Sequence, residues 1–200
     1  MKIYFHMCID GFSNCYLVVN EVTRQALIID PGEISMNLIE QIEDDGYSMD
    51  AVLITHNHPS NTQGMRTLLR IYSPRIYGAN IEYNSPDTTI LRGDGSIRIA
   101  GLDVEHIAMP GHRSDSMVYK IGQVLFTGDC LTAGLVGDTN TQYSKRIFIS
   151  NIKSKILTQT DSTAIFPGKG PPSTVGAERR FNKEVLRGGY KIMQNSPEGQ

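Results

Sequence analysis

Four apolar segments, each four to eight residues long, run directly into loops that carry histidine, aspartate, lysine and glycine. The segments are residues 51–54, 102–109, 124–127 and 163–166, and the loops that follow them contain His56 and His58, His112, Asp129, and Lys169, respectively. Short apolar runs bounded by such residues are typical of buried strands. Because loops after strands can converge on one edge of a sheet, we expect these polar side chains to form one site.

The order strands, helix, strand, helix occurs once in each half of the chain. This order predicts two similar βα halves that pack sheet on sheet with helices outside. Further strands are predicted at residues 2–8, 15–19, 26–29, 75–77, 97–99 and 117–121, and helices at 34–42, 62–71, 146–157 and 175–186. We expect one domain over residues 1–200, in which about 188–200 form a polar tail.

Composition and charge argue against several classes of protein. Nineteen Lys and Arg against twenty-one Asp and Glu give a net charge of −2, so the chain has no overall basic field for nucleic acid. No apolar run approaches the ~20 residues that a membrane helix needs, and residues 1–10 do not resemble a signal peptide. Three cysteines without a CxxC pair predict free thiols and a cytoplasmic protein.

Three of the five histidines lie in the loops that follow strands. His56 and His58 are two residues apart, so both imidazoles can reach one ion, and His112 follows a Pro-Gly turn that presents its ring. Asp129 follows Gly128 in the same way. Three imidazoles and one carboxylate form a suitable ligand set for Zn²⁺, and iron or manganese are the alternatives.

The loops resemble the sequence motifs of the metallo-β-lactamase superfamily, in its glyoxalase-II-like hydrolase branch. Residues 55–64 (THNHPSNTQG) resemble its T-H-x-H-x-D-H-x-x-G, residues 109–112 (MPGH) with Ser116 its T-P-G-H-T-x-G-S, residues 125–129 (LFTGD) its L-F-x-G-D, and residues 167–174 (PGKGPPST) its P-G-H-G-P-x-T. Residues 14–16 (NCY) and 30–32 (DPG) match its usual opening. The resemblance spans residues 12–181 and implies an α+β, four-layer αββα sandwich of two mixed β-sheets packed face to face.

By this resemblance, one metal would be held by His56, His58 and His112, which are all present. The second metal of the family would need an Asp, a His and a late His, and the chain has different residues at these positions. They are Ser60, Asn61 and Lys169, while the bridging carboxylate remains as Asp129. We therefore expect one metal, zinc first and iron or manganese as alternatives, and no second metal.

Lys169 and Asp129 are the residues expected to assist catalysis. An ammonium near Asp129 would replace part of the positive charge of a second ion and would repel such an ion, although Lys169 can also be a solvent-facing charge. Asp129 is a candidate base, and Lys169 a candidate for stabilising an oxyanion.

The leading functional hypothesis is a metal-dependent hydrolase that acts on a small ester, thioester or phosphoester through water on a single metal. One alternative is a pseudoenzyme that uses the old pocket to bind a ligand or protein. The other is a mononuclear iron enzyme resembling the persulfide dioxygenases, with His56, His112 and Asp129 as ligands. The expected partner is a small molecule rather than nucleic acid or a membrane, and the oligomeric state stays open.

Overall fold

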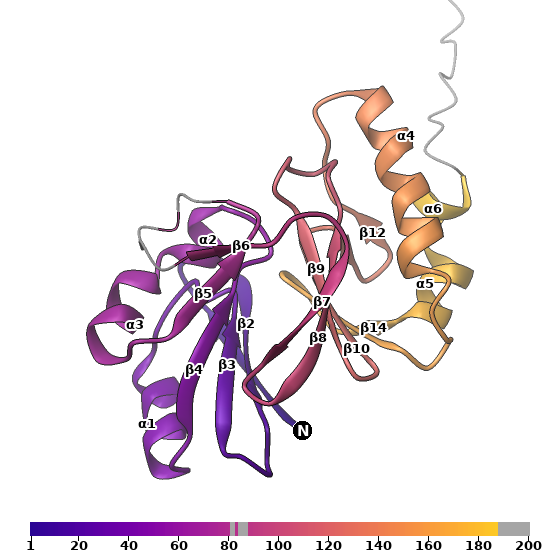
Figure 1. Cartoon of the computed structure of the whole chain (residues 1–200). Coiled ribbons are helices and arrows are strands. Elements are labelled where there is room, and N and C mark those ends of the chain that lie inside the picture. The colour runs from indigo at the N-terminus through magenta and orange to yellow at the C-terminus, as the bar shows by residue number, and fades with distance from the viewer. Residues whose placement is uncertain (81–82, 84–87, 188–200) are drawn as a thin grey trace, which may run out of the picture.

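The computed structural model describes residues 1–80, 83 and 88–187, so the predicted polar tail at residues 188–200 lies outside the described residues. Two six-stranded sheets pack face to face, and helices cover the outer face of each (Figure 1). The predicted αββα sandwich of two mixed sheets is confirmed. Among the described residues, no helix has the length and apolar composition needed to span a bilayer.

The first sheet has its strands in chain order. These strands are β1 (Lys2–Cys8), β2 (Ser13–Val19), β3 (Gln25–Ile29), β4 (Ser48–Leu53), β5 (Arg75–Gly78) and β6 (Thr88–Ile90). β2 is antiparallel to both of its neighbours, β1 and β3, and the strands β3 to β6 are parallel to one another. The carboxyl ends of β3 and β4 therefore lie at the same edge of this sheet.

The second sheet has the order β14-β13-β10-β9-β8-β7. Its strands are β7 (Gly95–Ile99), β8 (Leu102–Ala108), β9 (Met117–Ile121), β10 (Val124–Gly128), β13 (Ala164–Pro167) and β14 (Ser173–Thr174). β10 and β13 run parallel, and the other neighbours are antiparallel. The parallel pair delivers the loops that contain Asp129 and Lys169 to one edge.

The helices fall into two groups (Figure 1). The first sheet is covered by α1 (Met36–Asp44), α2 (Pro59–Thr62) and α3 (Met65–Ile71), and the second by α4 (Gln142–Asn151), its π-helical extension η1 (Ile152–Ile156), α5 (Val175–Phe181) and α6 (Lys183–Leu186). The predicted helix at 175–186 is divided, because Asn182 leaves the helical conformation and its side chain caps α6. The predicted helix at 62–71 instead belongs to two short helices, α2 and α3.

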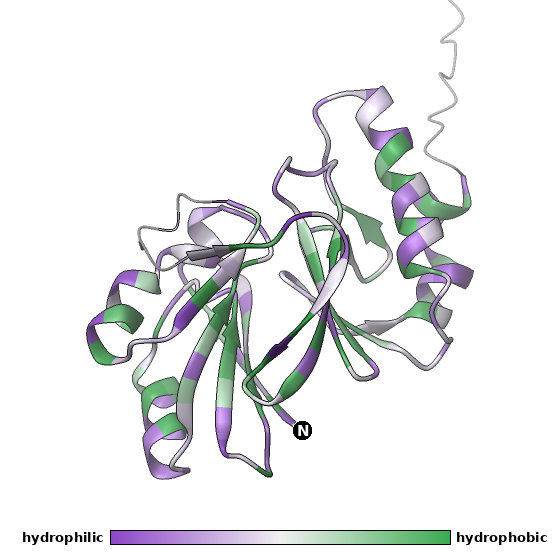
Figure 2. Cartoon of the chain, viewed as in Figure 1, coloured by the Kyte–Doolittle hydropathy of each residue, from purple (hydrophilic) through white to green (hydrophobic). Residues whose placement is uncertain are grey.

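Alternation along the strands produces three apolar layers. In β2, Tyr16 and Val18 face the space between the sheets, whereas Leu17 and Val19 face the helices of the first half. A third layer, which includes Leu125 and Phe148, fills the space between the second sheet and its helices. Figure 2 shows the same pattern, with hydrophobic strands inside and helices that alternate between hydrophobic and hydrophilic residues. This packing fixes the strand ends and with them the loops that follow.

Candidate metal centre

The predicted site loops meet where the edges of the two sheets join. The backbone N–H of Met117, at the start of β9, donates to the carbonyl of Thr55, 2.7 Å away. On the other side of the centre, Gly168 N–H donates to the Gly128 carbonyl, and Asn14 N–H donates to the Gly168 carbonyl. These bonds link both sheets at the centre, so the side chains that follow the strands are held by two packed layers rather than by free loops.

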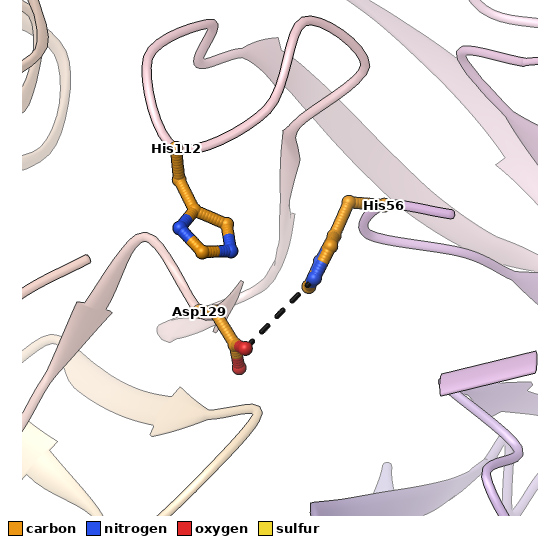
Figure 3. Close-up of side chains that lie close together, drawn as sticks. All are labelled: His56, His112 and Asp129. Carbon is orange, nitrogen blue, oxygen red and sulfur yellow. Dashed lines mark ion pairs between the residues drawn. The ribbon is translucent and has the colours of Figure 1, made fainter. Parts of the chain in front are cut away.

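His56, His112 and Asp129 form one group in which the ligand atoms all lie within 4.8 Å of one another (Figure 3). The rings of His56 and His112 have centroids 5.2 Å apart and are nearly perpendicular. His56 Nε2 lies 3.8 Å from Asp129 Oδ2. Two imidazoles and one carboxylate with space between them are a ligand set used for catalytic zinc and for non-haem iron.

The surroundings of His112 leave one ring nitrogen available. Its Nδ1 lies 2.9 Å from the backbone carbonyl oxygen of Asp138. A carbonyl oxygen can only accept, so Nδ1 carries the proton and Nε2 keeps its lone pair. Metal-binding histidines are commonly oriented by such a bond through the other nitrogen. His112 is therefore held in a form suited to a metal.

A buried chain of polar groups supports His56. The Thr55 hydroxyl donates to Asp30 Oδ2 at 2.6 Å, and its oxygen lies 3.2 Å from His56 Nδ1. Burial lowers the pKa of His56 to about 4, so the imidazole is neutral at pH 7 and one of its ring nitrogens has a lone pair. Burial also raises the pKa of Asp30 to about 7, against the hydrogen bonds from Thr55.

Asp30 and Thr55 had no predicted role. Both lie in segments that matched the family motifs, so the signal was present but was not interpreted as a support for His56. The carbonyl of Asp138 gave no signal at all, because every residue has a backbone carbonyl whatever its side chain.

Asp129 has one engaged oxygen and one free oxygen. Lys169 Nζ donates to Oδ2 at 2.7 Å. Oδ1 is buried and has no hydrogen-bond partner within the described structure. Buried carboxylate oxygens are normally satisfied, so this oxygen lacks a partner that a cation would supply. The donor set and this unsatisfied oxygen fit a bound metal ion.

Ser60 and Asn61 stand at the positions where the resemblance implies ligands of a second metal. Their side chains bond to the histidines instead. Ser60 Oγ lies 2.7 Å from His58 Nδ1 and donates to Asn61 Oδ1. The Asn61 amide lies 3.1 Å from His56 Nδ1. The two residues thus link the rings of His56 and His58 into one polar network.

His58 lies beside the group of three but not within it. Its ring centroid is 5.9 Å from that of His56, and its Nδ1 accepts from Ser60 N–H at the start of α2. Burial lowers the pKa of His58, and the positive charges of Lys169 and Arg113 lower it further. The role of His58 as a ligand stays a prediction.

The sharp turns before Asp129 and His112 depend on glycine. Gly128 has φ +51°, and a Cβ there would lie 2.4 Å from Thr55 Oγ1. A Cβ on Gly111 would lie 2.5 Å from the ring of Phe148. A side chain at Gly128 would push its loop away from Thr55 in the first half, and one at Gly111 would push its loop away from α4 of the same half. Gly128 therefore allows the two halves to approach each other at the centre, and Gly111 lets the His112 loop pack against α4.

The loop with Lys169 is tied to the first sheet. The Asn14 side chain donates to the carbonyls of Pro167 and Gly170, at 2.9 and 2.8 Å, and the Tyr16 hydroxyl donates to Pro167 as well. Both backbone segments that flank Lys169 are thus fixed. The ammonium is directed at Asp129 by the loop, while 41% of the side chain remains exposed.

An open cleft of about 710 Å³ lies beside His112. Its walls come from the loop after His112 and from residues 138–144. After β10 the chain forms a small hairpin, β11 (Leu131–Thr132) and β12 (Leu135–Val136), and α4 begins at Gln142, four residues before the predicted start at 146. The hairpin returns the chain to the centre and brings the Asp138 carbonyl to His112.

Comparison with known proteins agrees with this architecture. No family model matches the chain. An uncharacterised protein of Treponema pallidum is 33% identical over 175 residues, which cover 87% of this chain and 94% of that protein. The hydroxyacylglutathione hydrolase GloC of Haemophilus influenzae is 27% identical over 193 residues, which cover 84% and 91%.

Two solved structures have the same fold. The BLEG-1 B3 metallo-β-lactamase superimposes with a TM-score of 0.80 at 23% identity, over 92% of this chain and 99% of that one. ETHE1 from Myxococcus xanthus superimposes with a TM-score of 0.80 at 23% identity, over 94% of this chain and 85% of that one. The chain thus has the metallo-β-lactamase fold. It belongs to one family with the Treponema pallidum protein. These relatives support a metal-dependent hydrolase or a related enzyme.

Proposed function

We propose that the protein is a metal-dependent hydrolase that acts on a small thioester, ester or phosphoester through a single metal. The observation that carries the proposal is the group His56, His112 and Asp129, in which the ligand atoms lie within 4.8 Å of one another, His112 has a free Nε2 and the carboxylate has an unsatisfied oxygen. Similarity to a hydroxyacylglutathione hydrolase supports thioesters as the first substrates to test.

The proposed metal is one zinc ion, with iron or manganese as alternatives. A divalent ion at such a site lowers the pKa of a bound water toward ~7 and polarises a carbonyl or phosphoryl oxygen. His56, His112 and Asp129 would hold it, and His58 is a candidate fourth ligand. Lys169 supports the count of one, because its ammonium is already 2.7 Å from Asp129 and would repel a second cation.

The chain's own groups then have separate roles. If Asp129 does not ligate the ion, its Oδ2 is the base that accepts the proton of the attacking water. Lys169 lies beside this oxygen and reaches solvent, so its ammonium can donate to the oxygen of the substrate on which negative charge develops. Ser60 has no basic atom near neutral pH, and its hydroxyl is already bonded to Asn61. Asp129 and Lys169 are therefore the proposed catalytic residues.

A mononuclear iron enzyme resembling the persulfide dioxygenases is the second candidate. The observation that favours it is that the group consists of two histidines and one carboxylate, the set typical of non-haem iron, with His58 outside it. This candidate requires iron and consumption of oxygen with a persulfide, whereas the hydrolase requires neither.

The proposed partner is a small-molecule substrate, and the proposed location is the cytoplasm. The cysteines Cys8, Cys15 and Cys130 are free and buried in the structure, which supports a reducing compartment.

Turnover of matched substrates by the metal-loaded protein tests the proposal. Zinc-loaded and iron-loaded protein is assayed with a hydroxyacylglutathione, a small ester and a phosphoester, and oxygen uptake is measured with a persulfide. Hydrolysis that is lost in His112→Ala supports the hydrolase, and oxygen uptake by the iron form supports the second candidate. If the protein binds metal and does neither, the pseudoenzyme hypothesis replaces both.

A further inference from the structure

Two of the three cysteines are neighbours on adjacent strands. Cys8 is the last residue of β1 and pairs with Ser13 of β2, and Cys15 lies two residues further along β2. Both side chains belong to the apolar layer between the first sheet and its helices, so they project from the same face of the sheet. The two thiols make a hydrogen-bonding contact with each other. The fold thus brings together two sulfur atoms outside the metal centre.

The contact affects the two thiols in opposite ways. The hydrogen bond from Cys15 is the main cause that lowers the pKa of Cys8 to about 7, and a backbone hydrogen bond from Glu33 acts in the same direction. The same contact, together with burial, raises the pKa of Cys15 well above its ordinary value. Because the thiolate is the nucleophile in thiol chemistry, Cys8 is the attacking group and Cys15 is the second thiol of the pair.

Cys8 borders an exposed turn at the edge of the first sheet. Ile9 and Phe12 in this turn are 64% and 77% exposed, whereas Cys8 is 2% exposed. The Ile9 N–H donates to Glu33 Oε2 at 2.9 Å in an exposed hydrogen bond, and β1 is an edge strand. A strand end held by exposed hydrogen bonds opens more easily than the core does. Local opening of this turn would admit a small reagent to the Cys8 sulfur.

Cys130 provides a contrast within the same chain. It is 3% exposed and lies in the apolar layer of the second half, away from the other two cysteines. Burial raises the pKa of its thiol to about 12. A buried thiol with a raised pKa is inert, so exposure to the same reagent should leave Cys130 unchanged.

We propose that Cys8 and Cys15 form a reversible thiol–disulfide site that reacts with small, soluble disulfides. The Cys8 thiolate attacks one sulfur of the small disulfide, whose sulfur–sulfur bond breaks and releases one thiolate. Cys15 then attacks the Cys8 sulfur of this mixed disulfide and releases the second thiolate. The protons of the two cysteines pass through solvent to the two released thiolates. The cysteine pair loses two electrons, and the small disulfide gains them.

The pair lies behind two contacts that reach the metal centre. Ser13, which pairs with Cys8, donates from Oγ to the Ser60 carbonyl at 2.6 Å. Asn14, which precedes Cys15, donates to both backbone segments of the Lys169 loop. A bond between Cys8 and Cys15 would therefore cross-link β1 to the strand that carries both contacts.

Reaction of the native full chain with oxidised glutathione tests the inference. The treated chain is alkylated and cleaved after Lys and Arg, and its peptides are weighed by mass spectrometry. Cleavage after Lys2 and Arg24 leaves Cys8 and Cys15 together on residues 3–24 and Cys130 on another peptide. The peptide 3–24 should lose two hydrogen atoms and take up no alkyl group. Cys8 should react about 100-fold or more faster than Cys130.

Three serine variants separate the steps. Cys15→Ser keeps the attacking thiol but has no second thiol, so the reaction should stop with one glutathione on Cys8. Cys8→Ser leaves only the thiol with the raised pKa and should react no faster than Cys130. Cys130→Ser is the matched control, and formation of the Cys8–Cys15 bond should be unchanged in it.

Three results would overturn the inference. The first is an equal rate at Cys8 and Cys130 in the folded chain. The second is a glutathione adduct on Cys8 of the natural sequence that never proceeds to the internal disulfide. The third is a folded chain in which Cys8 does not react, although all three cysteines react in urea. None of these results depends on what the protein hydrolyses or on its metal content.

Discussion

The two sides of the centre are built differently. On one side, each metal-type side chain has its own support: His112 is held by the Asp138 carbonyl, and His56 by Thr55 and Asp30. On the other side, Ser60 and Asn61 bond to each other and to the neighbouring rings rather than facing an open position. One side is arranged to hold an ion, whereas the other is a closed hydrogen-bond network.

Charge is the feature that the two sides share. Lys169 places an ammonium 2.7 Å from Asp129, on the side where the superfamily resemblance implies a second metal. Asp129 thus has a positive counter-charge on a side where Ser60 and Asn61 form a closed network. A side chain without any ion can therefore supply a counter-charge to the central carboxylate.

The largest expected effect comes from removing a ligand on the supported side. His112→Ala removes one of three ligand side chains, so metal content should fall from about one ion per chain to nearly none, and turnover should fall with it. Elemental analysis of the purified variant checks this. His58→Ala should cause a smaller loss of metal, because His58 lies outside the group of three. Equal losses of metal in both variants would contradict this difference between the two histidines.

Restoring the other side should produce the next largest effect. The triple variant Ser60→Asp, Asn61→His and Lys169→His introduces the ligands implied by the resemblance and removes the repelling ammonium. It should bind about two metal ions per chain, where the natural sequence is expected to bind about one. Metal titration followed by elemental analysis gives the count. If Lys169→His alone already binds two ions, the ammonium rather than the missing ligands limits the count.

The buried support behind His56 predicts a specific pH dependence of stability. Burial raises the pKa of Asp30 to about 7, above its value in the unfolded chain. Between about pH 4 and pH 7 the folded protein therefore holds a proton that the unfolded chain releases, so the contribution of Asp30 to the free energy of unfolding falls as pH rises. Asp30→Asn has no proton to lose and should show a flatter profile over this range.

Urea unfolding of both proteins at several pH values measures the difference between the two profiles. All other titrating groups are common to both proteins. The pH dependence of the difference between their free energies of unfolding therefore belongs to Asp30. Parallel profiles for the natural sequence and Asp30→Asn would contradict the protonated, buried carboxyl behind His56.

The smallest effect concerns the loop with Lys169. Asn14→Ala removes one buried and one partly buried hydrogen bond to this loop and should lower the free energy of unfolding by about 1–3 kcal/mol. It should also weaken the contact of Lys169 with Asp129. Chemical denaturation measures the loss, and Asn37→Ala on the exposed face of α1 is the matched control. A loss no larger than that of the control would mean that Asn14 does not hold the loop.

Strand ends were the most predictable part of the fold. The run at 2–8 matches β1, and the runs before His56, His112 and Asp129 match β4, β8 and β10 to within a few residues, because buried strands are continuous apolar segments. The strands β6 and β14 were not predicted. They are three and two residues long and lie at sheet edges, so pairing with a neighbour defines them more than an apolar pattern does.

The residue types of the site could be predicted from the sequence, but the groups that hold these side chains in place could not. The sequence placed His56, His112 and Asp129 at strand ends, and the structure brings them together. Which nitrogen of His112 is free depends on a carbonyl 26 residues away, and that contact follows from the hairpin between them. The same limit applies to Lys169, whose direction is set by Asn14, in the other sheet.

The metal content of the natural sequence tests the central claim most directly. Protein prepared without chelator is supplied with zinc or iron, freed of excess ion and analysed for metal per chain. The account predicts about one ion per chain, held at His56, His112 and Asp129, with Lys169 in place of a second ion. Two ions per chain would contradict the role of Lys169, and none would contradict the metal centre itself.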